Sequence, residues 1–210
     1  ATPPYSLFDG KDYANMDDRD PEKFKLIEYH KWKFKAKIFS PLAPMTVKRT
    51  PVLMTRVEYG FVGSYNKHKR SPFETFYMGG DGMTGYSSTY ATETVGLRGY
   101  ENGSIAGNGY YESYGYAYSR LSMELRYPFI LEPSSTIYGL VFVEAGNAWT
   151  ELKDFNPFDL KRSAGVGVRI FLPMIGLMGI DWAYGFDTPN YGDRTKRSGS
   201  NFHFVIGQEF

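Results

Sequence analysis

Hydrophobic and polar residues alternate along most of the chain. In the first such run, four lysines alternate with Trp32, Phe34, Ala36 and Ile38. A β-strand sends alternate side chains to opposite faces, whereas an amphipathic helix needs apolar residues three and four positions apart. The alternation therefore predicts an all-β protein with strands at Lys31–Ile38, Val52–Gly63, Tyr116–Tyr127, Thr136–Trp149, Arg162–Leu172, Leu177–Phe186 and Asn201–Phe210.

The connections between the predicted strands differ greatly in length. The connection at 64–114 is very long, those at 128–135 and 173–175 are short, and prolines mark the short side. Long loops at one end of a sheet and short turns at the other are typical of an outer-membrane β-barrel. The pattern favours a transmembrane antiparallel β-barrel over a soluble β-protein, although both show the same alternation within a strand.

Small and aromatic residues favour the same interpretation. Glycines lie among the polar positions of the strands, which suits a crowded barrel interior, at Gly165, Gly167, Gly179, Gly185 and Gly207. Aromatic residues lie at strand ends, as in the girdles at membrane interfaces, at Tyr127, Trp149, Phe186, Phe202 and Phe210. Bacterial barrels close with an even number of strands, and an open edge cannot face hydrocarbon. Seven strands therefore predict part of a larger barrel.

The composition excludes several classes of protein. Lysine and arginine total 24 against 23 acidic residues, and this net charge of +1 argues against a nucleic-acid binder. The absence of cysteine excludes disulfides and thiolate metal sites. With 42% hydrophobic residues the chain is not intrinsically disordered, and no apolar stretch reaches the roughly 18 residues of a transmembrane helix.

No catalytic motif is present in the sequence. The histidines His30, His68 and His203 lack the HExxH spacing, and there is no G-x-S-x-G elbow, Walker loop or dinucleotide-binding fingerprint. We therefore expect a protein that is not an enzyme and that has no cofactor and no metal site.

Several short motifs follow one another in a specific order. They are Pro72–Gly80, Leu97–Tyr100, Met123–Leu125, Phe142–Trp149, Arg162–Gly167 and Phe202–Phe210. In this order they resemble the BamA family of outer-membrane β-barrel assembly proteins, from about Leu26 to Phe210. The segment Asp81–Gly96 is longer than the corresponding segment of that family.

The resemblance implies a sixteen-stranded barrel of which residues 1–210 form the C-terminal part. The seven strands would be the last seven, and the long loop at 64–114 would be the extracellular loop that folds back into the lumen. The N-terminal strands and the periplasmic domains of the family would lie outside this chain.

The resemblance also implies roles for particular residues. Leu97, Arg98, Gly99 and Tyr100 would form the loop-docking motif, and Arg98 would pair with Glu124 and Glu144 on the inner barrel wall. The strand pattern itself places Glu124 inside, but it places Glu144 inside only if Leu140 and Phe142 also face inward. The alternative for Arg98 is a solvated turn with a surface arginine.

The last predicted strand matches the C-terminal signal of outer-membrane barrels and, by resemblance, the strand of a lateral gate. Its matching residues are Phe202, Phe204, Ile206, Gly207 and Phe210. Gly207 would permit the strand to bend inward, and the alternative is a small residue needed for packing. The lysine row at 31–37 is interpreted as a hydrated lumen wall.

The resemblance implies a core component of outer-membrane protein assembly, which inserts β-barrel clients through a lateral gate beside the last strand. Its partners would be unfolded outer-membrane proteins, accessory assembly lipoproteins and the lipid bilayer of the bacterial outer membrane. The alternatives are a two-partner secretion transporter that exports a soluble substrate, a passive outer-membrane channel, and a soluble β-protein.

Overall fold

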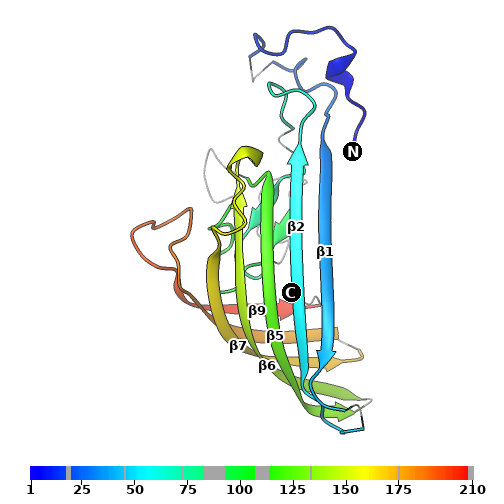
Figure 1. Ribbon diagram of the computed structural model, residues 1–210, viewed down its shortest axis with the longest axis vertical. Helices are drawn as coiled ribbons and strands as arrows, with labels where there is room; N and C mark the ends of the chain where they lie inside the picture. The colour runs from blue at the N-terminus through cyan, green and yellow to red at the C-terminus, as the bar shows by residue number, and fades with distance from the viewer. Residues whose placement is uncertain are drawn as a thin grey trace.

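One antiparallel sheet of seven strands forms most of the molecule (Figure 1). The computed structural model describes residues 1–17, 20–44, 46–71, 73–82, 93–106, 114–132, 134–174 and 176–207. The strands of the sheet, in spatial order, are β1 (His30–Pro41), β2 (Val52–Gly63), β5 (Ala117–Glu132), β6 (Ser135–Trp149), β7 (Lys161–Leu172), β8 (Gly176–Gly185) and β9 (Gly199–Ile206). This order confirms the all-β antiparallel architecture that the alternation predicts.

The sheet is strongly twisted and curved. In Figure 1, β1 and β2 stand nearly upright, whereas β9 runs across the view behind them. The residues before β1 lie beyond the upper ends of β1 and β2, and the short connections β1–β2 and β5–β6 lie at the lower end. Helical structure in the described residues is limited to two 3-10 turns, η1 (Tyr5–Leu7) and η3 (Leu152–Asp154). In the described part of the chain no helix has the length and apolarity needed to cross a membrane.

The long connection between β2 and β5 contains a second, smaller sheet that the alternation did not predict. Its strands β3 (Phe76–Met78) and β4 (Glu93–Val95) pair in parallel. Each has three residues, too few to establish a two-residue period. Backbone hydrogen bonds also join Phe76 to Gly115, which lies two residues before β5.

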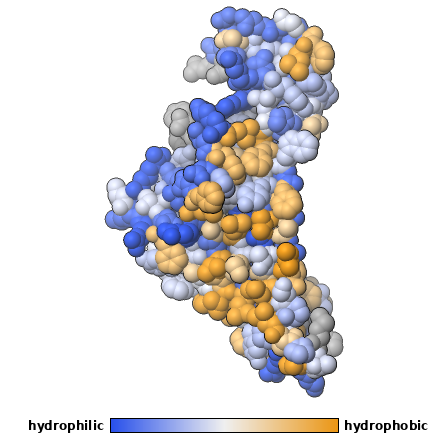
Figure 2. Space-filling view, in the orientation of Figure 1, coloured by the Kyte–Doolittle hydropathy of each residue, from blue (hydrophilic) through white to orange (hydrophobic). Residues whose placement is uncertain are grey.

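The two faces of the large sheet have opposite chemistry. The face turned away from the β2–β5 connection, here called the outer face, exposes large apolar side chains on every strand of the large sheet except β2, where they are half-buried. Examples with exposed fractions between 41% and 69% are Trp32 on the edge strand β1 and, further along the sheet, Met123, Val141, Val166, Trp182 and Phe204. Figure 2 shows hydrophobic side chains gathered over the sheet, and mostly hydrophilic ones with one hydrophobic group over the N-terminal segment.

The opposite face, here called the inner face, buries charged side chains. Its buried ionisable residues include Arg56, Glu58, Arg120, Glu124, Glu144, Arg169, Asp181 and His203. A water-soluble sheet buries its apolar face and exposes its polar one, so this distribution is inverted. It is the distribution expected of a barrel wall with lipid outside and a polar interior.

The apolar core lies between the β2–β5 connection and the upper part of the inner face. The sheet contributes Val62, Tyr118 and Ala148 to this core. The connection contributes the larger part, namely Phe76, Met78, Val95, Leu97, Tyr100, Ile105 and Ala106. The connection is therefore an integral layer of the fold.

The structure also determines details that the sequence left open or misplaced. In β6, Leu140 and Phe142 are buried and Val141 and Val143 are exposed, so Glu144 lies on the inner face. Trp149 is not an exposed girdle residue, because its ring packs edge-on against Phe155, with 4.8 Å between centroids.

The distribution of side chains predicts the effect of a charge on the outer face. Val141 is 56% exposed near the middle of β6, so Val141→Arg would be almost neutral in water. If the outer face contacts lipid, the same substitution should destabilise the full-length protein by about 2–4 kcal/mol. Urea unfolding in lipid vesicles measures this loss, with Val141→Leu as the control. An unchanged midpoint for Val141→Arg would contradict a lipid-facing surface.

Candidate functional site

The candidate site is the place where the tip of the β2–β5 connection meets the inner face. Backbone hydrogen bonds hold the tip, from Leu97 N to Gly80 O at 3.1 Å and from Ile105 N to Met78 O at 3.1 Å. The apolar side chain of Leu97 is fully buried in the core described above. These contacts fix the backbone on either side of Arg98 and aim its side chain at the sheet.

Arg98 is fully buried and contacts three carboxylates on three strands. Its Nη2 donates to Glu124 Oε1 on β5 at 2.5 Å and to Glu144 Oε1 on β6 at 2.8 Å. Its Nη1 donates to Asp181 Oδ2 on β8 at 3.1 Å, and its backbone N donates to Glu144 Oε2 at 2.9 Å. A planar guanidinium suits this arrangement, because its donors diverge in one plane toward separate acceptors.

Each of the three carboxylates also has an arginine partner on the sheet itself. Arg126 lies 2.7 Å from Glu124, Arg120 lies 2.7 Å from Glu144, and Arg169 donates twice to Asp181 at 2.6 Å. These groups total four arginines against three carboxylates. The sheet is therefore charge-paired without Arg98, which adds a fourth cation that all three carboxylates share.

An aromatic ring completes the surroundings of Arg98. Its Cζ lies 3.5 Å from the ring centroid of Phe142, within the range of a cation–π contact. Burial alone would lower the pKa of the Arg98 guanidinium, but the adjacent Glu144 and Glu124 carboxylates outweigh burial and raise the pKa above its ordinary value. Arg98 is therefore charged at every physiological pH.

Glycines on the inner face leave the space that the cluster occupies. A Cβ atom at Gly167 would lie 1.7 Å from Asp181 Oδ1, and one at Gly165 would lie 2.5 Å from the Phe142 ring. Larger residues at these positions would displace the Arg98 partners. The glycines that were interpreted as signs of a crowded interior thus lie directly against residues of the Arg98 cluster.

The residues after Arg98 connect the loop tip to the end of the sheet. Gly99 N donates to His203 Nε2 at 2.8 Å, and Asn201 Nδ2 donates to Gly99 O at 3.0 Å, both on β9. The φ of Gly99 is +88°, and a Cβ there would lie 2.8 Å from Ser163 Cβ, so only glycine fits. Tyr100 Oη donates to Arg162 O at 2.7 Å.

The predicted gate residues lie apart from this cluster, on the outer face. Phe202, Phe204 and Ile206 of β9 are between 57% and 67% exposed. Gly207 directly follows the strand with φ +72°, and its N donates to Leu177 O at 2.7 Å. The strand therefore ends at Ile206, before Gly207, which the prediction placed inside a strand at Asn201–Phe210. Phe210 lies outside the described residues.

The lysine row of β1 contacts acidic residues of the β2–β5 connection. Glu93 lies 3.0 Å from both Lys31 and Lys33 and 3.7 Å from Lys35, and Glu74 lies 3.0 Å from Lys31. Burial alone would raise the pKa of the Glu93 carboxyl, but hydrogen bonds from Lys33 and Lys31 outweigh burial and lower the pKa. Ion pairs with lysines of β1 thus hold Glu93, and with it the strand β4, against the inner face of β1.

The sequence reasoning missed Asp181, His203 and the three sheet arginines as parts of the site. A signal for them was present, because Asp181 and His203 lie on the polar side of their predicted strands. Their proximity to Arg98 depends on the path of the loop across four strands, which periodicity within a strand does not specify.

Comparisons with known proteins agree with this architecture. Residues 23–210 match the Omp85 superfamily domain. The chain belongs to the Omp85 superfamily. The apolar outer face and the charged, buried inner face agree with an outer-membrane β-barrel family.

A solved structure has the same fold as this Omp85 chain. BamA from Haemophilus ducreyi lacking POTRA domains 1-3 is similar over 85% of the chain, with a TM-score of 0.58 and 21% sequence identity. The match covers 35% of the BamA chain, so the present chain spans about a third of that protein. A comparison with curated protein sequences gives no match.

The geometry of Glu144 predicts a large loss of stability when its charge is removed. Glu144 accepts hydrogen bonds from both Arg98 and Arg120, all fully or almost fully buried. Glu144→Gln should therefore destabilise the full-length protein by about 3–5 kcal/mol, because two buried cations lose a counter-charge. Urea unfolding followed by gel shift measures this. Glu151→Gln is the control, since Glu151 pairs with the exposed Lys153 outside the sheet, at 2.7 Å. Equal losses for both variants would contradict this account.

Removal of Arg98 should have a different effect, because every sheet carboxylate keeps an arginine partner. In Arg98→Ala the sheet should remain folded, with an unchanged heat-modifiable gel shift, while the β2–β5 connection becomes sensitive to protease. Arg98→Lys should be intermediate, since an ammonium keeps the charge but not the planar fork. Full protease resistance in Arg98→Ala would show that the apolar contacts of the connection are sufficient to hold it.

Proposed function

We propose that the protein containing this chain is a core component of outer-membrane protein assembly, which folds β-barrel clients and inserts them into the bilayer through a gate beside β9. The observation that carries the proposal is the contact of one loop tip with both the barrel wall and the terminal strand. Arg98 contacts β5, β6 and β8, and the adjacent Gly99 contacts β9.

The properties of β9 support its proposed role as a gate. It has eight residues, whereas the other strands of the large sheet have 10 to 16. Glycines with positive φ, Gly199 and Gly207, lie at its first position and directly after its last. A short strand that ends at such glycines has few ladder hydrogen bonds to break when it separates from a neighbour.

In the proposed mechanism, opening beside β9 exposes strand edges to an incoming client. A client strand adds to an exposed edge through main-chain hydrogen bonds, which is a form of β-augmentation. The energy for insertion comes from the client, because its backbone is satisfied and its apolar face is buried in the bilayer. No chemical step is required of this chain, and accessory lipoproteins would act as partners.

Arg98 is proposed to brace the wall and to link it to β9. Movement of β9 away from the loop tip would break the hydrogen bonds of Gly99 with His203 and Asn201. The charge-paired wall beneath Arg98 would persist during this movement, since each carboxylate has a second arginine partner. In this proposal, movement of β9 at the gate is therefore coupled to undocking of the loop tip from β9.

A reconstitution of the complete parent protein in liposomes tests this function. An unfolded outer-membrane protein is added, and its folding is followed by heat-modifiable gel shift. Folding should be faster than in empty liposomes, and Arg98→Glu should slow it, because the substitution places a fourth carboxylate among three. Lys153→Glu, a charge reversal at an exposed residue, is the matched control.

Three results distinguish the alternatives. No acceleration in the presence of accessory partners would contradict the insertase role. A large steady conductance in planar bilayers without acceleration would favour a passive channel, and export of a soluble substrate would favour a two-partner secretion transporter. Equal acceleration by wild type and Arg98→Glu, at equal protein level, would contradict the bracing role alone.

A further inference from the structure

The outer face carries a furrow that the proposed function does not use. Two hollows lie on it, with volumes of about 810 and 460 Å³. On β5 the first contacts Met123 and the second Leu125, and on β6 the first contacts Val143 and the second Val141. These pairs are successive outward positions on the same strands, so the hollows adjoin. Together they form one groove, here called the outer furrow.

The furrow results from the sizes of neighbouring side chains. Its floor on β6 and β7 includes the smaller residues Gly139, Val141, Val143, Ala145 and Val166. Its walls, on β5 and on or directly after β8, include the large residues Met123, Leu125, Tyr127, Trp182 and Phe186. At the lower end the Phe129 ring closes the furrow. It lies over Gly139, 2.8 Å from the position that a Cβ atom of that residue would take.

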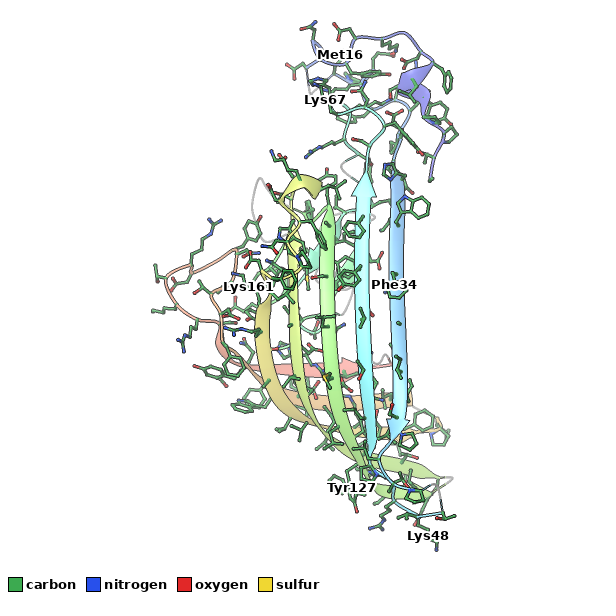
Figure 3. All side chains as sticks on the ribbon, in the orientation of Figure 1. Met16, Phe34, Lys48, Lys67, Tyr127 and Lys161 are labelled. Carbon is green, nitrogen blue, oxygen red and sulfur yellow. The ribbon has the colours of Figure 1, made fainter. Side chains whose placement is uncertain are left out.

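The length of the furrow fits one leaflet of a bilayer. From Ala145 to Gly139 the floor spans six residue steps, or roughly 20 Å at about 3.3 Å for each step. A strand tilt of about 40° reduces the depth to roughly 15 Å, which is half of a hydrocarbon core of about 30 Å. Figure 3 labels Lys161 and Tyr127, which lie near the upper and lower ends of this region.

The upper end of the furrow is basic. Arg162 and Arg197 line it, and Asp187 holds the Arg162 guanidinium through contacts of 2.9 and 3.1 Å. Arg197 forms no ion pair with any residue that the structure describes, and its side chain is exposed. Residues 161–162 and 187–197 contain five basic and two acidic side chains, a net charge of +3. This end belongs to the long connections, at the level where lipid headgroups meet water.

The chemistry of the furrow selects among possible occupants. Its floor strands β6 and β7 are paired on both sides, so they offer no free edge to the backbone of a client strand. An apolar trough on a lipid-facing surface suits an acyl chain, and arginines bind phosphate through two parallel hydrogen bonds. We propose that the outer furrow binds a phosphorylated anionic lipid, with one acyl chain along β6 and β7 and the phosphate at Arg197 and Arg162.

A fluorescence experiment on the complete parent protein in phosphatidylcholine vesicles tests this site. The probes are phosphatidic acid and phosphatidylcholine with brominated acyl chains, which quench nearby tryptophan. Trp182 lines the furrow, and the difference between wild type and Trp182→Phe isolates its signal. Brominated phosphatidic acid should quench Trp182 more effectively than brominated phosphatidylcholine, and Arg197→Gln should reduce its relative association constant roughly fivefold.

Matched variants separate the furrow from general surface effects. Arg194→Gln removes the same charge from the same connection outside the furrow, and it should leave the preference for phosphatidic acid nearly unchanged. Ala145→Phe fills the first hollow, which Ala145 lines, and should abolish the preference. Ala36→Phe makes the same change on the outer face of β1, and it should have no effect. Heat-modifiable gel shift verifies that each variant is folded.

Several results would overturn the proposal. These are equal quenching by the two lipids, equal effects of Arg197→Gln and Arg194→Gln, or a preference that persists in folded Ala145→Phe. Weak quenching by both lipids together with a dimer in size measurements would assign the furrow to a second copy of the chain. The site does not depend on insertase activity, so client folding and lipid preference are measured separately.

Discussion

A buried guanidinium must be compensated, and Arg98 meets this requirement with carboxylates from three strands of one sheet. The rest of the inner face is arranged around this contact. Glycines open the space, Phe142 lies against the guanidinium, and arginines of the sheet hold each carboxylate in place. The loop tip thus covers the charged inner face of the sheet.

The opposite face follows from the same inversion. Since the polar groups face inward, the outer face consists of apolar side chains. The shape of this surface therefore follows from the sizes of those side chains. Small residues on β6 and β7 between large ones on β5 and β8 produce the outer furrow, and the basic residues at its upper end give it polarity. The inner face thus contacts the loop tip, and the outer face carries the proposed lipid site.

Much of the fold could be predicted from the sequence, because a period of two is a local property. All seven large strands were predicted, with the bounds of Val52–Gly63 unchanged. The orientation of β6 could not be decided, since Leu140 to Val143 are apolar on both faces and only burial separates them. The small sheet β3–β4 and the roles of Asp181 and His203 depend on contacts between residues far apart in the chain. The resemblance to a known family indicated Arg98, Glu124 and Glu144, but not the sheet arginines that pair with the carboxylates.

The central claim is that the loop tip is docked on the wall and on β9 in the membrane-embedded protein. Hydrogen–deuterium exchange at the amides of Arg98 and Gly99, in the complete parent protein in lipid, tests it most directly. Both amides donate to inner-face side chains, to Glu144 and His203. The account predicts exchange as slow as in the central strands β5 and β6. Exchange as fast as in the exposed connection 187–198 would contradict it.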